Sequence, residues 1–195
     1  MRYLPIFQLE WLVNELSSLG IKCKIGNILN DISPARRAYF EKWLLHRDGF
    51  VTMQDESIDY IGIEDVVRIG PFYNVYCLID DEHIIENDDN AIKLLCANPY
   101  FNLHNGKVTK FGWSGSVLAD ILASDVSLYN SFVKNIMKEE VRKISVKVAN
   151  YACIIETRIW EPSGLASIYE VIDRIGFNVK ELLKQIHLGE NDDFK

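Results

Sequence analysis

The chain alternates between segments whose apolar residues recur every three to four positions and segments dense in β-branched and aromatic residues. The first helical pattern spans residues 5–19, where Leu9, Leu12 and Leu16 share one face and Pro5 suits the first turn. A second spans residues 33–49, with Ser33 as a candidate cap, Pro34 in the first turn and Gly49 as a stop. This second pattern predicts a broad aromatic face, which either packs on the core or binds a partner. Its members are Tyr39, Phe40, Trp43 and Leu44.

Two regions have the composition of strands. Residues 50–79 contain three β-rich runs with short breaks, which predicts an antiparallel meander. Residues 141–160 predict either a strand pair turning near Ala149-Asn150 or a single long strand. Between the two regions, Asn105-Gly106 is a typical hairpin dipeptide.

Further helices are expected in the second half of the chain. Asp88 or Asp89 caps a helix through Cys96, and a helical region at 117–140 is interrupted near Ser124-Asp125. A helix over 165–176 ends at Gly176, and Asn178 begins a last short helix in a capping-box pattern.

This order of elements favours an α+β fold over a doubly wound parallel sheet, because strict strand–helix alternation is absent. We expect the meander at about 50–79 and the strand pair at about 141–160 to pack with amphipathic helices in one domain, 1–195. The alternative is a boundary near residue 100, which would separate a helix and meander (1–100) from a helix–hairpin–helix unit (101–195).

Composition and charge favour a globular protein without a membrane-spanning segment. Apolar residues make up 48% of the 195 residues and charged residues 25%, as in a globular protein. No apolar run reaches the roughly 18 residues of a membrane span, and the N-terminus lacks the features of a signal peptide. The net charge of −7 arises mainly from residues 80–89, which carry six acids, and from the C-terminal tail. The rest is close to neutral, so nothing favours nucleic-acid binding.

The cysteines and histidines show no metal or catalytic spacing. Each cysteine lies among apolar neighbours, and no C-x-x-C pair occurs, which predicts buried free thiols in a reducing cytoplasm. The four cysteines are Cys23, Cys77, Cys96 and Cys153. The four histidines are scattered at His46, His83, His104 and His187.

The most suggestive candidate for a ligand site is the glycine-rich loop before the helix at 117. Glycines permit close approach of a ligand, and the free N–H groups of a helix start favour an anion. The candidate ligand-binding residues are Gly112, Trp113, Ser114, Gly115, Ser116 and Arg158. The spacing matches neither a P-loop nor a nucleophile elbow, and the alternative is a tight turn with a serine cap and Trp113 on the core.

The acidic segment 80–89 surrounds His83 with carboxylates. Asp81, His83 and Glu86 are weak candidates for a divalent cation, but the segment lacks the central glycine of a calcium loop. A solvated turn explains the segment without a metal, and an acidic patch also suits a basic protein partner. We therefore expect neither a metal nor a cofactor.

Together these features predict a non-enzymatic binding or regulatory module that acts through protein–protein contacts, by partner binding or self-association. The alternative is a protein or enzyme that binds a small anionic ligand at Gly112–Ser116.

Overall fold

The computed structural model describes residues 6–44, 49–54, 57–65, 73–85, 88–104, 107–137, 141–159 and 164–192. Within these ranges there are seven helices and eight strands. The helices are α1 (Ile6–Ser18), α2 (Ile28–Asp31), α3 (Pro34–Leu44), α4 (Asp89–Leu95), α5 (Val117–Ser124), α6 (Val126–Met137) and α7 (Gly164–Asp192). The strands are β1 (Cys23–Gly26), β2 (Phe50–Met53), β3 (Tyr60–Asp65), β4 (Tyr73–Asp80), β5 (Ala97–His104), β6 (Lys107–Gly115), β7 (Val141–Ala149) and β8 (Ala152–Ile159).

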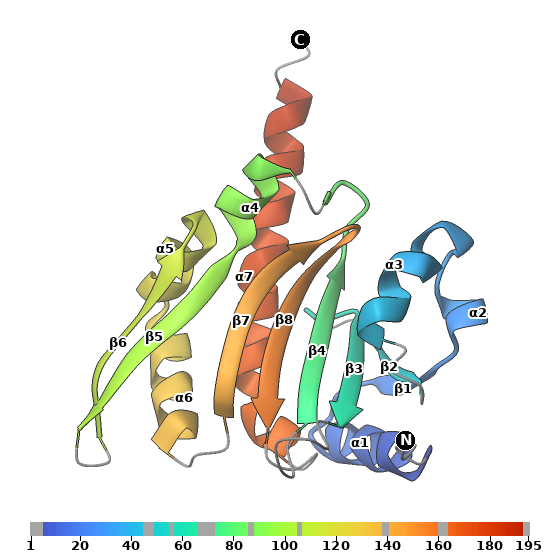
Figure 1. Ribbon diagram of the computed structural model, residues 1–195, viewed down its shortest axis with the longest axis horizontal. Coiled ribbons are helices and arrows are strands. Elements are labelled where there is room, and N and C mark those ends of the chain that lie inside the picture. Colours follow the sequence, from blue (N-terminus) through green and yellow to red (C-terminus); the bar gives the residue numbers. More distant parts are fainter. Residues whose placement is uncertain are drawn as a thin grey trace.

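All eight strands form one antiparallel sheet, in the order β1-β2-β3-β4-β8-β7-β5-β6 (Figure 1). The expected α+β class with an antiparallel sheet is confirmed. The meander appears as β2, β3 and β4, and the strand pair as β7 and β8, which turn at Asn150 and Tyr151. Strand β4 pairs with β8 from Tyr73↔Ile159 to Asp80↔Ala152, so the two halves of the chain share the centre of the sheet.

One face of the sheet carries the main core. Alternate residues of β2, β3, β4, β7 and β8 point to this face, which α7 crosses and α1, α5 and α6 extend (Figure 1). Helix α7 buries Leu165, Ile168, Ile172, Ile175 and Val179, at the three- and four-residue spacing of an amphipathic helix. This continuous apolar stripe explains why the helix is long.

The opposite face is covered only in part. Helix α3 packs Phe40 against Tyr60, and Tyr60 packs against Phe50, at the β2–β3 end of the sheet. The same cluster reaches the β7–β8 turn, where Ala149, Ala152 and Ile154 are buried with Phe40. The aromatic pattern of α3 is therefore a core contact at Phe40, whereas Tyr39 is 43% exposed. The side chains of Trp43 and Leu44 lie outside the described residues.

Two predictions about local structure are wrong. Gly176 and Asn178 neither end nor begin a helix, because α7 runs unbroken for 29 residues. Gly176 instead lets the helix approach the chain at Ser57 and Ile58, where a Cβ would lie 2.7 Å from Ile58 Cδ1 and 3.0 Å from the Ser57 carbonyl oxygen. Asn178 donates to Asp125 Oδ2 at 3.3 Å, which links α7 to the start of α6.

The second difference concerns residues 97–115, for which the sequence indicates a hairpin dipeptide at Asn105-Gly106 and a loop at 112–116 but no bounds for strands. They form β5 and β6, with a register shift at Asn102/Leu103. The turn of this hairpin, Asn105-Gly106, lies outside the described residues.

The cysteines are free, as expected, although Cys23 and Cys96 are only partly buried. Among the described residues, no helix combines the length and the apolar composition that a membrane-spanning segment requires.

Candidate functional site

The segment 112–116 is not a loop in the structure. Residues Gly112 to Gly115 form the end of β6, and Ser116 precedes α5. Trp113 is 7% exposed and packs edge-on against Phe111 and Phe132. Its position agrees with the alternative prediction, in which Trp113 covers the core.

The backbone at Gly115 is closely packed. Gly115 has a φ of 137°, and a Cβ there would lie 2.5 Å from the carbonyl oxygen of Cys96. Ser116 makes no side-chain cap, because its hydroxyl donates to the carbonyl of Leu94 at 3.0 Å. The glycine therefore permits the approach of α4 to the start of α5.

The structure does not bring Arg158 to this segment. Arg158 lies on β8, and β7 and β5 separate it from β6. The six candidate residues consequently occupy two different places on the sheet.

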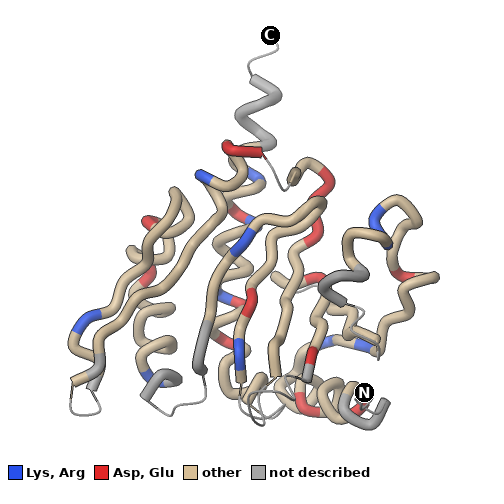
Figure 2. Tube along the Cα trace, in the orientation of Figure 1, with Lys and Arg blue, Asp and Glu red and all other residues tan. Residues whose placement is uncertain are grey.

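The described acids of the segment 80–89 lie at the end of the sheet where β4 leads into α4, and other acids are spread along the chain (Figure 2). Asp80 is the last residue of β4, and Asp88 caps α4 by accepting from the Asn90 N–H at 2.9 Å. Asp81 Oδ1 accepts from the His83 N–H at 2.9 Å and lies 3.3 Å from His83 Nδ1. Glu86 lies outside the described residues, within which no group of three His, Cys, Asp or Glu side chains is arranged to hold a metal ion.

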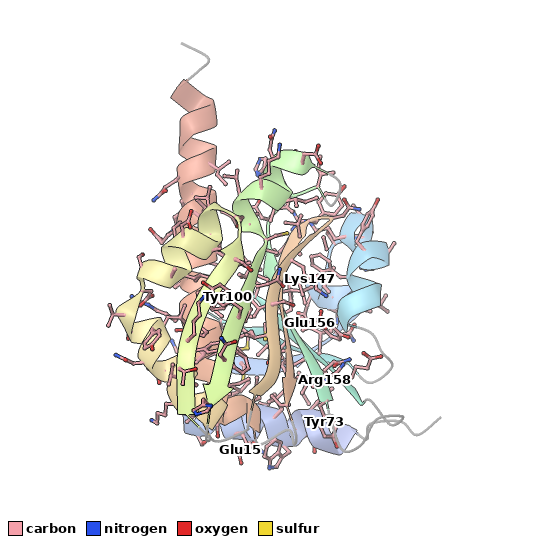
Figure 3. All side chains as sticks on the ribbon, turned by 60° about the vertical axis from the view of Figure 1, so that its left-hand side comes forward. Glu15, Tyr73, Tyr100, Lys147, Glu156 and Arg158 are labelled. Atoms are coloured by element: carbon pink, nitrogen blue, oxygen red, sulfur yellow. The ribbon has the colours of Figure 1, made fainter. Side chains whose placement is uncertain are left out.

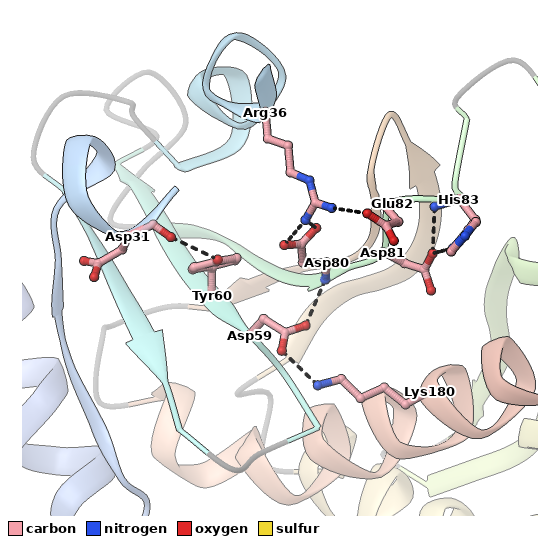
Figure 4. Close-up of polar contacts among 9 residues, drawn as sticks. All are labelled: Asp31, Arg36, Asp59, Tyr60, Asp80, Asp81, Glu82, His83 and Lys180. Atoms are coloured by element: carbon pink, nitrogen blue, oxygen red, sulfur yellow. Dashed lines mark hydrogen bonds and ion pairs between the residues drawn. The ribbon is translucent and has the colours of Figure 1, made fainter. Parts of the chain in front are cut away.

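Next to these residues lies an ion-pair cluster, which we define as Arg36, Asp59, Asp80, Glu82 and Lys180 (Figure 4). The Arg36 guanidinium contacts both carboxylate oxygens of Asp80 and lies 3.5 Å from Glu82 Oε2. Asp59 accepts from the Asp80 backbone N–H at 2.8 Å and from Lys180 Nζ at 2.9 Å. The cluster thus joins α3, β4 and α7.

Burial raises the pKa of Asp80, and the neighbouring Arg36 only partly offsets this effect. Burial, with the charges of Asp80 and Asp59, also raises the pKa of Tyr60 to about 12. In both cases the largest cause is burial of the titrating group itself, which disfavours its charged form. The contact between Arg36 and Asp80 ties α3 to the end of β4.

A pocket of about 170 Å³ opens beside this cluster, between the 83–84 segment, α4 and α7. We call it the α4–α7 pocket. Its interior is mainly aliphatic, and its polar members are few. The pocket is lined by His83, Ile84, Asp88, Asn90, Ala91, Leu94, Leu95, Leu183 and Ile186.

The acidic rim of this pocket is evident in the sequence, but its floor is not. Leu183 and Ile186 belong to α7, about a hundred residues from His83 in the chain. No local signal in the sequence indicates that these apolar residues of α7 border the acidic segment.

Comparison of the chain with protein-family models, with curated proteins and with solved structures found no match.

Proposed function

We propose that this protein is a non-enzymatic binding module that accepts an apolar side chain of a basic partner segment in the α4–α7 pocket. The observation that carries this proposal is an aliphatic cavity of about 170 Å³ that opens among carboxylates. An apolar cavity of about 150 Å³ is large enough for benzene. The pocket is therefore of the right size for one leucine, methionine or phenylalanine side chain.

The charge around the pocket supports a basic partner. Five carboxylates of the described residues lie on the segment that forms its rim, where Arg36 pairs with Asp80 and Glu82, and the His83 ring lies 3.3 Å from Asp81. These acids are Asp80, Asp81, Glu82, Asp88 and Asp89. Such a field attracts positive charge and repels acidic competitors. Lysine or arginine on either side of an apolar anchor matches both features.

The polar groups of the pocket favour binding over catalysis. Its titratable lining residues are His83 and Asp88. Asp88 is engaged in capping α4, and the His83 ring contacts Asp81. Neither arrangement pairs a nucleophile with a base, which a hydrolytic or transfer reaction would require.

Three blocked pentapeptides test the proposal with the full chain. One has a central leucine flanked by two lysines on each side, the second has serine at the centre, and the third has glutamates as flanks. Fluorescence anisotropy at low salt should rank the first peptide tightest. Burial of a leucine side chain contributes about 1.5–3 kcal/mol, which corresponds to a roughly 10- to 150-fold loss for the serine peptide.

Two variants locate the binding. Ala91→Leu fills the pocket and should reduce affinity for the leucine peptide to that of the serine peptide. Asp88→Asn keeps a good helix cap but removes a charge, and should weaken binding by about two- to fivefold at low salt. The matched controls are Ala123→Leu and Asp120→Asn, which change exposed residues of α5. Equal affinity for the leucine and serine peptides, or unchanged binding by Ala91→Leu, would refute the proposal.

A further inference from the structure

The sheet face on which α3 packs also carries a row of charged side chains that the α4–α7 pocket does not include. Lys147 on β7 and Glu156 and Arg158 on β8 follow one another along the strands, with Tyr100 of β5 beside them (Figure 3). Lys147 Nζ forms an ion pair with Glu156 Oε2, and Glu156 is 8% exposed. Arg158 is half-buried at the far end of this row.

Arg158 differs from the other arginines whose side chains are described. Arg36 pairs with Asp80, and Arg174 pairs with Asp125. Arg37 donates to the backbone carbonyls of Ile28, Leu29 and Ile32. Arg158 has neither kind of partner among the described residues: no carboxylate lies within ion-pair distance, and no backbone carbonyl accepts from its guanidinium.

Arg158 is nevertheless held in a fixed orientation. Its Nε donates to Asn74 Oδ1 at 3.0 Å, and Asn74 Nδ2 donates to Glu64 Oε2 at 3.2 Å. The Tyr76 hydroxyl donates to the same Glu64 oxygen at 2.8 Å. This chain of contacts across β3, β4 and β8 fixes the guanidinium through Nε, and no described residue accepts a hydrogen bond from its two terminal nitrogens.

We propose that the terminal nitrogens of Arg158 bind a carboxylate group, in a second site separate from the α4–α7 pocket. The two terminal nitrogens of a guanidinium match the two oxygens of a carboxylate. Glu64 and Glu156 lie on the same face, and their charges penalise a dianion such as phosphate more than a monoanion. The site lies at the Asn74 end of β4, whereas the pocket lies beyond Asp80 at the other end.

The carboxylate can come from a small molecule or from an acidic side chain of a peptide, and the probes separate these sources. We suggest titrating the full chain with acetate, with a blocked peptide containing one glutamate, and with inorganic phosphate at constant ionic strength. The signal is the Nε–H resonance of Arg158 in a ¹H–¹⁵N spectrum, assigned with Arg158→Lys. A saturable shift with acetate and the peptide supports a site for any carboxylate, and a shift with the peptide alone assigns the site to a peptide.

Arg158→Lys keeps the charge but loses the paired donors, and should weaken carboxylate binding at least about fivefold, read from backbone amide shifts of β8. Arg174→Lys is the matched control, because Arg174 lies on α7 and pairs with Asp125. It should leave binding unchanged. The proposal is overturned if neither carboxylate shifts the signal, if phosphate binds as well as acetate, or if Arg158→Lys binds as tightly as the parent chain.

Discussion

Gly115, the closely packed glycine at the end of β6, should not tolerate a larger residue. Replacing Gly115 by alanine places a Cβ 2.5 Å from the backbone carbonyl oxygen of Cys96 and puts an L-residue at a φ of 137°. A side-chain rotation cannot relieve the clash, because the carbonyl oxygen belongs to the backbone that joins α4 to β5. It cannot relieve the unfavourable φ either, because φ is a backbone angle. The chain must therefore shift.

Two contributions set the size of the effect. A non-glycine residue in a sparsely populated backbone region costs about 1–3 kcal/mol. Crowding a packed site adds about 1–3 kcal/mol. Gly115→Ala should therefore lower the free energy of unfolding by about 2–6 kcal/mol, a large share of the 5–15 kcal/mol typical of a domain. The corresponding fall in Tm is roughly 5–20 °C for a chain of this size.

Gly112→Ala on the same strand is the matched control. Its Cβ would also lie 2.5 Å from an existing atom, but that atom is the hydroxyl oxygen of Tyr100, a side chain that is 45% exposed and free to move aside. Gly112→Ala should thus change stability by less than about 1 kcal/mol. Urea unfolding followed by circular dichroism measures both variants. If Gly115→Ala is as stable as Gly112→Ala, the close packing described at Gly115 is wrong.

Three further predictions concern α7, α6 and the thiols. In Gly176→Ala, the gain of about 1 kcal/mol in helix propensity should be outweighed by crowding against Ser57, which gives a net loss of about 1 kcal/mol in urea unfolding; a more stable variant would contradict this contact. Burial alone would raise the pKa of Asp125, but hydrogen bonds from the Leu128 N–H and from Arg174 outweigh burial and lower this pKa. The ionised Asp125 therefore stabilises the fold fully above about pH 4, and this stabilisation is lost as the pH falls further. The stability difference between the parent chain and Asp125→Asn should accordingly shrink between about pH 5 and pH 3, and a constant difference would exclude the ionised cap. Burial raises the pKa of the Cys77 and Cys153 thiols, so iodoacetamide should label neither at pH 8 until the protein is unfolded, as read by peptide mass spectrometry; rapid native labelling would show that they are accessible.

Local signals in the sequence determined most of the elements. Asp88 before α4 and Pro34 in the first turn of α3 act within one turn of the chain, so their effects can be read without knowing the fold. The same holds for the β-branched runs of the meander and of the β7–β8 pair. These signals established an antiparallel α+β protein.

Contacts between distant segments were decided only by the tertiary structure. Gly176 has the local appearance of a helix stop, but its small size serves a contact with Ser57, more than a hundred residues away. Strands β5 and β6 were missed because Pro99 and the glycines of β6 are poor strand formers, and their pairing with each other and with β7 compensates.

In both proposed sites, the sequence indicates single charged residues, whereas the tertiary structure decides which side chains surround them. The sequence alone identified the acids of residues 80–89 and named Arg158, since charge is a property of single residues. It could not show that Leu183 and Ile186 of α7 complete a pocket beside those acids, or that Asn74 orients Arg158. Which side chains meet depends on strand order and on the path of α7, and these are set by burial of the whole core rather than by any local pattern.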